Sequence, residues 1–242
     1  MRRKRMITVS AVTTLTLAAS LSGAYWALWQ EPEFYAEAMQ QPEDPVAQKQ
    51  QAKQFVQRTL RLVDDIRHAN HWSEQFSQEQ VNSWLAEELH PKYADIIPRG
   101  VNDPRVRFVP DTVQIGFRYQ RGDWQGIVSL NVKPCVPQDN QLALEIQSVR
   151  AGLLPIPLDP VIENVLKGMR KRGWSVEWQH ANGNDVLLID IERSAAQPPR
   201  LQSIHVTQNG LRITGERNPN GSDYADLRSQ LSWKQNDQTS RR

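Results

Sequence analysis

Cysteine is nearly absent from this chain, with Cys135 as the one thiol among 242 residues. An intramolecular disulfide is therefore excluded, and the folded state must be stabilised by a packed core. Neither a lipobox nor a second thiol accompanies Cys135. Its setting indicates a structural or incidental thiol rather than a reactive one.

The sequence also lacks a strong excess of charge of one sign. Its net charge is +2, and the four basic residues at positions 2–5 leave a charge of −2 on the rest of the chain. Nucleic-acid binding depends on a basic patch that neutralises phosphates. We therefore expect no nucleic-acid partner.

Signatures of catalysis are missing as well. The chain has no Gly-x-Ser-x-Gly elbow and no glycine-rich phosphate loop. His68 and His71 form a close histidine pair, but no third ligand with a recognisable spacing follows, so no metal site is predicted. We predict no catalytic residue, no cofactor and no enzymatic activity. A hydrolase assembled from distant acids is an alternative that these patterns leave open.

What the chain does contain is an uncharged stretch over residues 7–29, preceded by four basic residues. At about 1.5 Å per residue, a helix of that length would cross a hydrocarbon core of about 30 Å. Because short basic flanks stay in the cytoplasm, residues 1–29 predict a signal anchor, a single-pass transmembrane helix with an extracytoplasmic body behind it. The alternative is a signal peptide cleaved after residues 22–24, Ser-Gly-Ala, which would give a secreted protein.

Composition divides the rest of the chain into three parts. Residues 30–46 are acidic and punctuated by proline, which is typical of a juxtamembrane linker. Residues 47–217 predict one extracytoplasmic α+β domain. Residues 218–242 are polar and predict a flexible tail.

Helical periodicity opens the predicted domain. Apolar residues recur at helical spacing through residues 45–69, including Phe55, Leu62 and Ile66. Ser77 is placed as the N-cap of a second helix, with Gln80 three residues later closing a capping box. The sequence therefore predicts two amphipathic helices ahead of the sheet.

The period then changes from 3.6 to 2, which is typical of strands with one buried face. An antiparallel meander is predicted over residues 112–120, 124–132 and 141–150, with a turn at residues 121–123. Further strands are predicted at residues 174–179, 185–191, 201–207 and 211–215. The core is expected to include the aromatic side chains Trp84, Trp124, Trp174 and Trp178.

A proline-rich segment leads into a third helix. Asp159 is placed as its N-cap and Pro160 at its first position, where no backbone N–H is needed. The helix ends in a basic cluster that complements the helix dipole, made of Lys167, Arg170, Lys171 and Arg172. The same four side chains would contact anionic headgroups if they faced a membrane.

Two of these motifs carry a resemblance to a known family. The polar helix start with Ser77, Gln80 and Asn82, and the Gly-Leu-Leu-Pro-Ile-Pro run over residues 152–157, resemble the YpmS-like group of membrane-anchored bacterial proteins. In its order of elements that group is similar to tubular lipid-binding domains, in which a curved antiparallel sheet wraps long helices around an apolar groove. The resemblance implies this α+β fold and transfers no active-site residue.

The leading hypothesis is a membrane-anchored, non-enzymatic domain that binds a lipid or another apolar ligand between its helices and its sheet. Apolar burial would supply the affinity, at about 0.8 kcal/mol per methylene before ordering costs. The predicted groove takes its residues from the apolar faces of the helices and strands: Val81, Leu85, Val113, Ile115, Phe117, Leu130, Leu144, Val161, Val165 and Met169.

The alternative is a cell-envelope interaction or assembly module with a filled core and a protein partner. The same apolar residues would fill an ordinary core, so the sequence leaves both possibilities open. A continuous apolar cavity above roughly 300 Å³ would favour ligand binding. Its absence would favour the interaction module.

Overall fold

The computed structural model describes residues 19–20, 22–23, 25–40, 44–93, 97–157, 166–171, 173–181, 183–191 and 199–217. Its helices include α2 (Glu33–Gln40), α3 (Pro45–His68), α4 (Gln78–Tyr93) and a short segment over residues 166–171. Its strands are β1 (His71–Phe76), β2 (Val101–Val109), β3 (Thr112–Arg121), β4 (Trp124–Gln138), β5 (Gln141–Ala151), β6 (Leu154–Pro155), β7 (Ser175–Ala181), β8 (Asn184–Asp190), β9 (Pro199–Thr207) and β10 (Gly210–Arg217).

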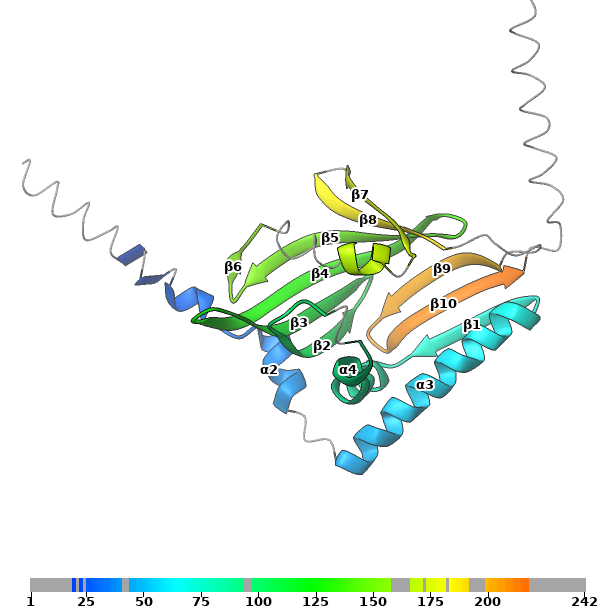
Figure 1. Cartoon of the computed structure of the whole chain (residues 1–242), viewed down its shortest axis with the longest axis horizontal. Helices are drawn as coiled ribbons and strands as arrows, with labels where there is room; N and C mark the ends of the chain where they lie inside the picture. The colour runs from blue at the N-terminus through cyan, green and yellow to red at the C-terminus, as the bar shows by residue number, and fades with distance from the viewer. Residues whose placement is uncertain are drawn as a thin grey trace, which may run out of the picture.

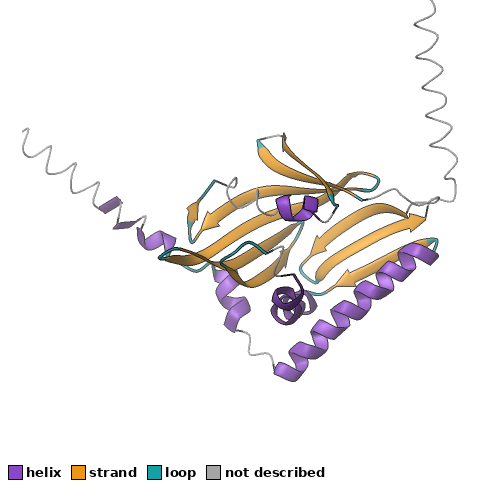
Figure 2. Cartoon of the chain, in the orientation of Figure 1, coloured by secondary structure: helices purple, strands orange, loops and turns teal. Residues whose placement is uncertain are grey.

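The strands form two antiparallel sheets (Figure 1). A three-stranded sheet has the order β1-β10-β9, and a seven-stranded sheet has the order β2-β3-β4-β5-β8-β7, with β6 paired to β5. Helix α3 packs along β1, and α4 lies beside β2 at the edge of the larger sheet. Figure 2 shows more strand than helix in the described chain, with the longer helices gathered along one side of the two sheets.

The prediction of a transmembrane helix is wrong. Among the described residues, no helix is long and apolar enough to cross a membrane. The described end of the predicted anchor contacts the turn between β5 and β6, where the Ala27 carbonyl accepts a hydrogen bond of 2.9 Å from the Leu153 N–H. The signal anchor, the single-pass topology and the extracytoplasmic location derived from it are therefore not supported. Residues 1–18 and the tail at 218–242 lie outside the described residues.

The predicted fold class also needs correction. The expectation was an anchor followed by helices on one curved sheet, whereas the described chain is mainly antiparallel strand, divided between two sheets. Strands β1 and β2 were not predicted. The first carries a charged residue, Glu74, at a buried position, and the second is interrupted by Pro104 and a positive φ at Asp103. Both features hide the alternation that identifies a strand from sequence.

The predicted meander is confirmed as β3, β4 and β5. In its register Ile115 pairs with Leu130, and Leu130 pairs with Val149, so all three side chains lie on one face. Strand β4 continues past the predicted end to Gln138, and irregular register near Cys135 accommodates the prolines of this segment. The later predicted strands are present as β7 to β10.

The predicted capping box at the start of α4 is confirmed. The Gln80 N–H donates to Ser77 Oγ at 3.3 Å, and the Ser77 N–H donates to Gln80 Oε1 at 3.2 Å. These two bonds satisfy main-chain donors that a helix start would otherwise leave free. Helix α3 also occupies its predicted range, with Asp44 accepting from the Val46 N–H at 3.1 Å.

Helix α2 lies within the predicted linker but packs on the larger sheet. Its Phe34 and Tyr35 are buried beside Ile127. The sheet approaches them closely at Gly116, where an added Cβ would lie 2.7 Å from Tyr35 Cδ2. The Tyr35 hydroxyl donates a hydrogen bond of 2.9 Å to the Asp103 carbonyl.

The expected burial of four tryptophans is correct for most of them. Trp84 packs against Phe55, with ring centroids 5.2 Å apart, and Trp124 and Trp178 are partly buried on the inner face of the larger sheet. Trp174 is the exception, with 54% of its surface exposed. It lies in the connection before β7, where strand parity does not apply.

Candidate functional site

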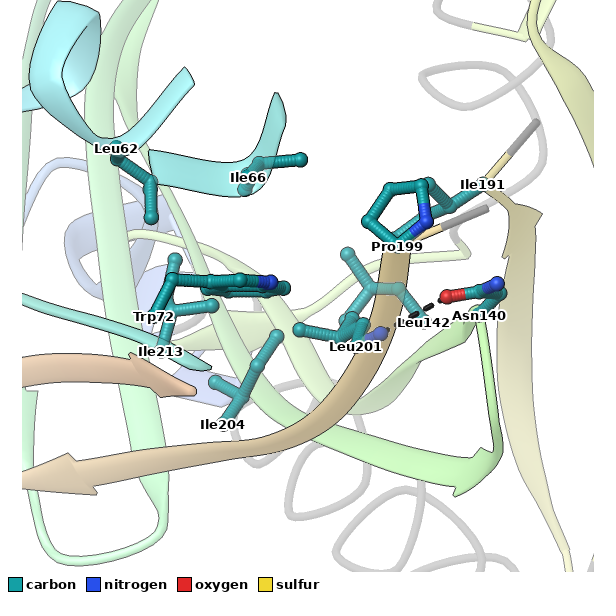
Figure 3. A pocket seen from close by; sticks show the side chains of 10 residues that line it. All are labelled: Leu62, Ile66, Trp72, Asn140, Leu142, Ile191, Pro199, Leu201, Ile204 and Ile213. Atoms are coloured by element: carbon teal, nitrogen blue, oxygen red, sulfur yellow. Dashed lines mark hydrogen bonds between the residues drawn. The ribbon is translucent and has the colours of Figure 1, made fainter. Parts of the chain in front are cut away.

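An apolar cavity of about 230 Å³ lies where α3 and the three-stranded sheet meet the ends of β5 and β8 (Figure 3). One side of it is open to solvent. The wall is contributed by segments far apart in the sequence: Leu62, Ile66, Trp72, Asn140, Leu142, Ile191, Pro199, Leu201, Ile204 and Ile213. None of the described residues of this wall carries a charged side chain.

The floor of the cavity is set by the register of β1, β10 and β9. Trp72 pairs with Gly215, and Gly215 pairs with Leu201, so these three residues share one face of the small sheet. Between the pairs Thr214–Ser203 and Gly215–Leu201 the register shifts by one residue, so Gln202 has no partner on β10 and the alternation is interrupted on β9. Such a bulge re-aims the neighbouring side chains, which brings the Ile204–Ile213 pair onto the cavity as well.

The Trp72 indole lies over Gly215. A Cβ added at Gly215 would be 2.0 Å from Trp72 Cζ2 and 2.3 Å from the Arg200 carbonyl oxygen, so only glycine leaves room for the ring. Trp72 is 6% exposed, and its Nε1 is buried without a hydrogen-bond partner among the described residues. A buried donor left unpaired costs about 1–3 kcal/mol.

The opposite wall is held by Asn140, which lies in the turn between β4 and β5. Its Oδ1 accepts a hydrogen bond of 2.8 Å from the Leu201 N–H, and its main-chain oxygen accepts one of 2.8 Å from the Ile191 N–H. The residue has φ of 61° and is buried. Asparagine tolerates this left-handed conformation better than most residues. Through its side chain Asn140 ties β9 to the larger sheet, and through its main-chain oxygen it holds the end of β8 at the turn between β4 and β5.

The charges near the cavity are paired with one another. Buried Glu74 lies 2.6 Å from Arg58 of α3 and also accepts from the Gln75 N–H at 3.1 Å. Arg200 is ion-paired with Asp139. Arg200 alternates with the cavity residue Leu201 along β9, so its side chain leaves the opposite face of the sheet. The wall of the cavity, as far as the structure describes it, therefore contributes no charge to the interior.

None of the described residues of the predicted groove lines this cavity. The structure distributes them along the inner face of the larger sheet and the helices packed on it. One group surrounds Val106 and Phe108 and consists of Val81, Leu85, Val113 and Ile115. A second group contains Phe117 and Leu130, and a third contains Leu144 and Met169 beside Leu166. Val161 and Val165 lie outside the described residues.

The predicted headgroup cluster is only partly described. Lys171 is exposed, and Arg170 donates a hydrogen bond of 3.5 Å to the Val176 carbonyl. Arg172 lies outside the described residues, and Lys167 makes a contact of its own. This geometry favours neither a lipid contact nor a purely structural role, so the headgroup contact stays a prediction.

The Cys135 thiol and the possible metal ligands of the described chain give no sign of a reactive site. Burial raises the pKa of the Cys135 thiol above its ordinary value, and the nearby Glu145 carboxylate raises it further. The thiol is therefore protonated and weakly nucleophilic at neutral pH. In the described ranges, no group of three or more histidine, cysteine and carboxylate side chains is arranged to hold a metal ion.

Trp72 and Asn140 are not among the residues predicted for a site. The sequence offers a weak signal for Asn140, which follows Asp139 at a turn between two strand patterns. No local signal marks Trp72, because its position depends on a strand pair closed across more than a hundred residues.

Comparison with protein-family models, with curated proteins and with solved structures gives no match. The resemblance to the YpmS-like group therefore stays a prediction. What the site can do has to be inferred from its own geometry.

Proposed function

We propose that this protein is a non-enzymatic binding protein that takes a small apolar ligand into the cavity beside Trp72. The cavity itself carries the proposal, because it is walled almost entirely by apolar side chains and is open on one side. Sites for small molecules are concave and mainly apolar, with a few polar groups that fix orientation. Of the wall residues that the structure describes, Trp72 and Asn140 are the ones with polar side-chain atoms.

The volume narrows the class of ligand. At about 230 Å³ the cavity falls below the roughly 300 Å³ expected for a lipid-sized ligand. An apolar cavity of about 150 Å³ holds benzene, so by proportion this one accommodates about nine heavy atoms. The ligand is accordingly a compact ring system or a short branched chain, and the affinity comes from apolar surface removed from water.

Indane, a neutral bicyclic hydrocarbon, is a suitable probe for the proposal. The wild-type protein should bind indane saturably by isothermal titration calorimetry, and Ile66→Phe should abolish binding by filling the cavity. Leu60→Phe is the matched control, since Leu60 is on the same helix but 64% exposed. Absence of saturable binding by a folded wild-type protein, or equal binding by the Ile66→Phe variant, would overturn the proposal.

A protein-interaction module is the second candidate, and the small cavity volume favours it. Helix α3 exposes Leu60 and also Val63, which is 39% exposed. Residues three apart lie on one helix face, so the two side chains form a small apolar strip. This candidate predicts that Leu60→Glu with Val63→Glu changes the association state in sedimentation velocity, while Ile66→Phe does not.

A further inference from the structure

The residues that line the cavity indicate one chemical feature of its ligand, and this inference rests on the proposed function. Trp72 contributes one hydrogen-bond donor, the indole Nε1–H, which is buried and finds no acceptor in the described part of the chain. Buried indole N–H groups usually have a partner. Figure 3 shows the nitrogen-bearing end of the ring facing the space between Ile66, Pro199 and Leu201.

We propose that the ligand is a neutral apolar molecule with one carbonyl-type oxygen, which accepts a hydrogen bond from Trp72 Nε1–H. The indole nitrogen can only donate, so the complementary atom of the ligand is an acceptor. Among the described wall residues the one side-chain oxygen, Asn140 Oδ1, already accepts a hydrogen bond of 2.8 Å from the Leu201 N–H.

The ligand is uncharged because nothing in the described wall of the cavity would balance a charge. Among the described wall residues there is no lysine, arginine or histidine. Moving an ionised carboxylate out of water without a partner is strongly unfavourable, whereas a neutral ketone or ester oxygen exchanges its hydration for one hydrogen bond to the protein.

The donor is also fixed in direction before the ligand arrives. The indole is 6% exposed and packs directly on the backbone at Gly215, which leaves the ring little room to move. A preorganised donor avoids the ordering cost that a mobile side chain would carry on binding. The position of the carbonyl in the bound ligand is therefore set by the protein.

The test compares indane with 1-indanone, which has the same skeleton and one added carbonyl. For each protein, the measured quantity is the dissociation constant of indane divided by that of 1-indanone. Comparing this ratio between wild type and Trp72→Phe cancels the different hydration of the two probes. A neutral hydrogen bond contributes enough to change this ratio by about 3- to 10-fold. The Trp72→Phe variant should lose that preference, and Trp174→Phe, the same change at an exposed position, should keep it.

The outcomes separate the two proposals. If neither probe binds, the proposed function fails and this inference fails with it. If both probes bind and the ratio is the same in wild type and Trp72→Phe, the carbonyl assignment fails while the binding function stands.

Should Trp72→Phe not fold, the wild-type protein labelled with ¹⁵N at its indoles decides the question. The Trp72 Nε1 proton should move downfield on addition of 1-indanone and not on addition of indane. An identical response to both probes would overturn the carbonyl assignment.

Discussion

The side-chain amide of Asn82 makes both main-chain hydrogen bonds of Val106. Its Nδ2 donates to the Val106 carbonyl at 2.9 Å, and the Val106 N–H donates to its Oδ1 at 2.7 Å. One turn earlier, Gln78 Oε1 accepts from the Phe108 N–H at 3.0 Å. Because β2 is the edge of the larger sheet, α4 takes the place of a missing strand there. An edge covered in this way is protected from pairing with another chain.

Replacing Asn82 by alanine should therefore destabilise the fold and expose the β2 edge. Two buried main-chain groups would lose their partners, at about 1–3 kcal/mol each. We expect the free energy of unfolding in urea to fall by at least about 2 kcal/mol, with more aggregation on heating. Asn102→Ala is the control, since Asn102 makes an exposed hydrogen bond of 3.2 Å to the Gly100 carbonyl. Equal stability losses in the two variants would contradict the role given to Asn82.

The start of α4 also illustrates what the sequence can predict. The Ser77–Gln80 capping box is readable because donor and acceptor are three residues apart. Asn82 lies two residues after the capping box, but its hydrogen-bond partner, Val106, is 24 residues away in the sequence. Its role is therefore not visible in a local pattern. The strands β3 to β5 are predictable for a similar reason, since each is defined by its own alternation and joined by short turns.

The cavity escapes prediction because its wall is assembled by register rather than by periodicity. Alternation correctly places Phe117 and Leu130 on the apolar face of the larger sheet. Which part of that face is covered by other elements depends on how α4 and β9 pack against it, and alternation does not show this. The transmembrane prediction fails differently. A hydropathy window counts apolar residues and ignores local contacts such as the hydrogen bond between Ala27 and Leu153.

Gly215→Ala should disturb the cavity floor. The new Cβ would meet Trp72 Cζ2 at 2.0 Å and the Arg200 carbonyl at 2.3 Å, and neither is the free end of a flexible chain. Overpacking of this kind costs about 1–3 kcal/mol. We expect that loss in urea unfolding, together with a changed chemical shift of the Trp72 indole proton. Gly23→Ala, with nothing within 4 Å of its added Cβ, should leave both measurements unchanged.

Cys135 should make stability depend on pH in the alkaline range. Burial raises the pKa of its thiol above the ordinary 9.0, so the folded state keeps a proton that the unfolded state releases. Above about pH 9 the free energy of unfolding therefore decreases with rising pH. Cys135→Ala removes this contribution. Between about pH 8 and about pH 10.5, the free energy of unfolding of the wild type should therefore fall more than that of the variant. A pH-independent difference would contradict a raised pKa.

Gly116→Ala should release α2 from the sheet. The added Cβ would lie 2.7 Å from Tyr35 Cδ2 and 3.0 Å from Phe34 Cζ, so the helix would have to move outward. Chymotrypsin cleaves after aromatic residues, and both Phe34 and Tyr35 are buried, so the native protein should resist cleavage there. We expect cleavage at these sites to be faster by at least about tenfold in Gly116→Ala, because each 1.4 kcal/mol of lost docking is a factor of ten in the open population.

Tyr35→Phe separates packing from hydrogen bonding at the same place. It keeps the ring against Gly116 and removes the hydrogen bond of 2.9 Å from the hydroxyl to the Asp103 carbonyl. A single net hydrogen bond contributes about 1 kcal/mol, so cleavage should accelerate by about fivefold, less than in Gly116→Ala. If Tyr35→Phe were the more susceptible variant, α2 would be held mainly by its hydroxyl rather than by the close approach of the helix to the sheet.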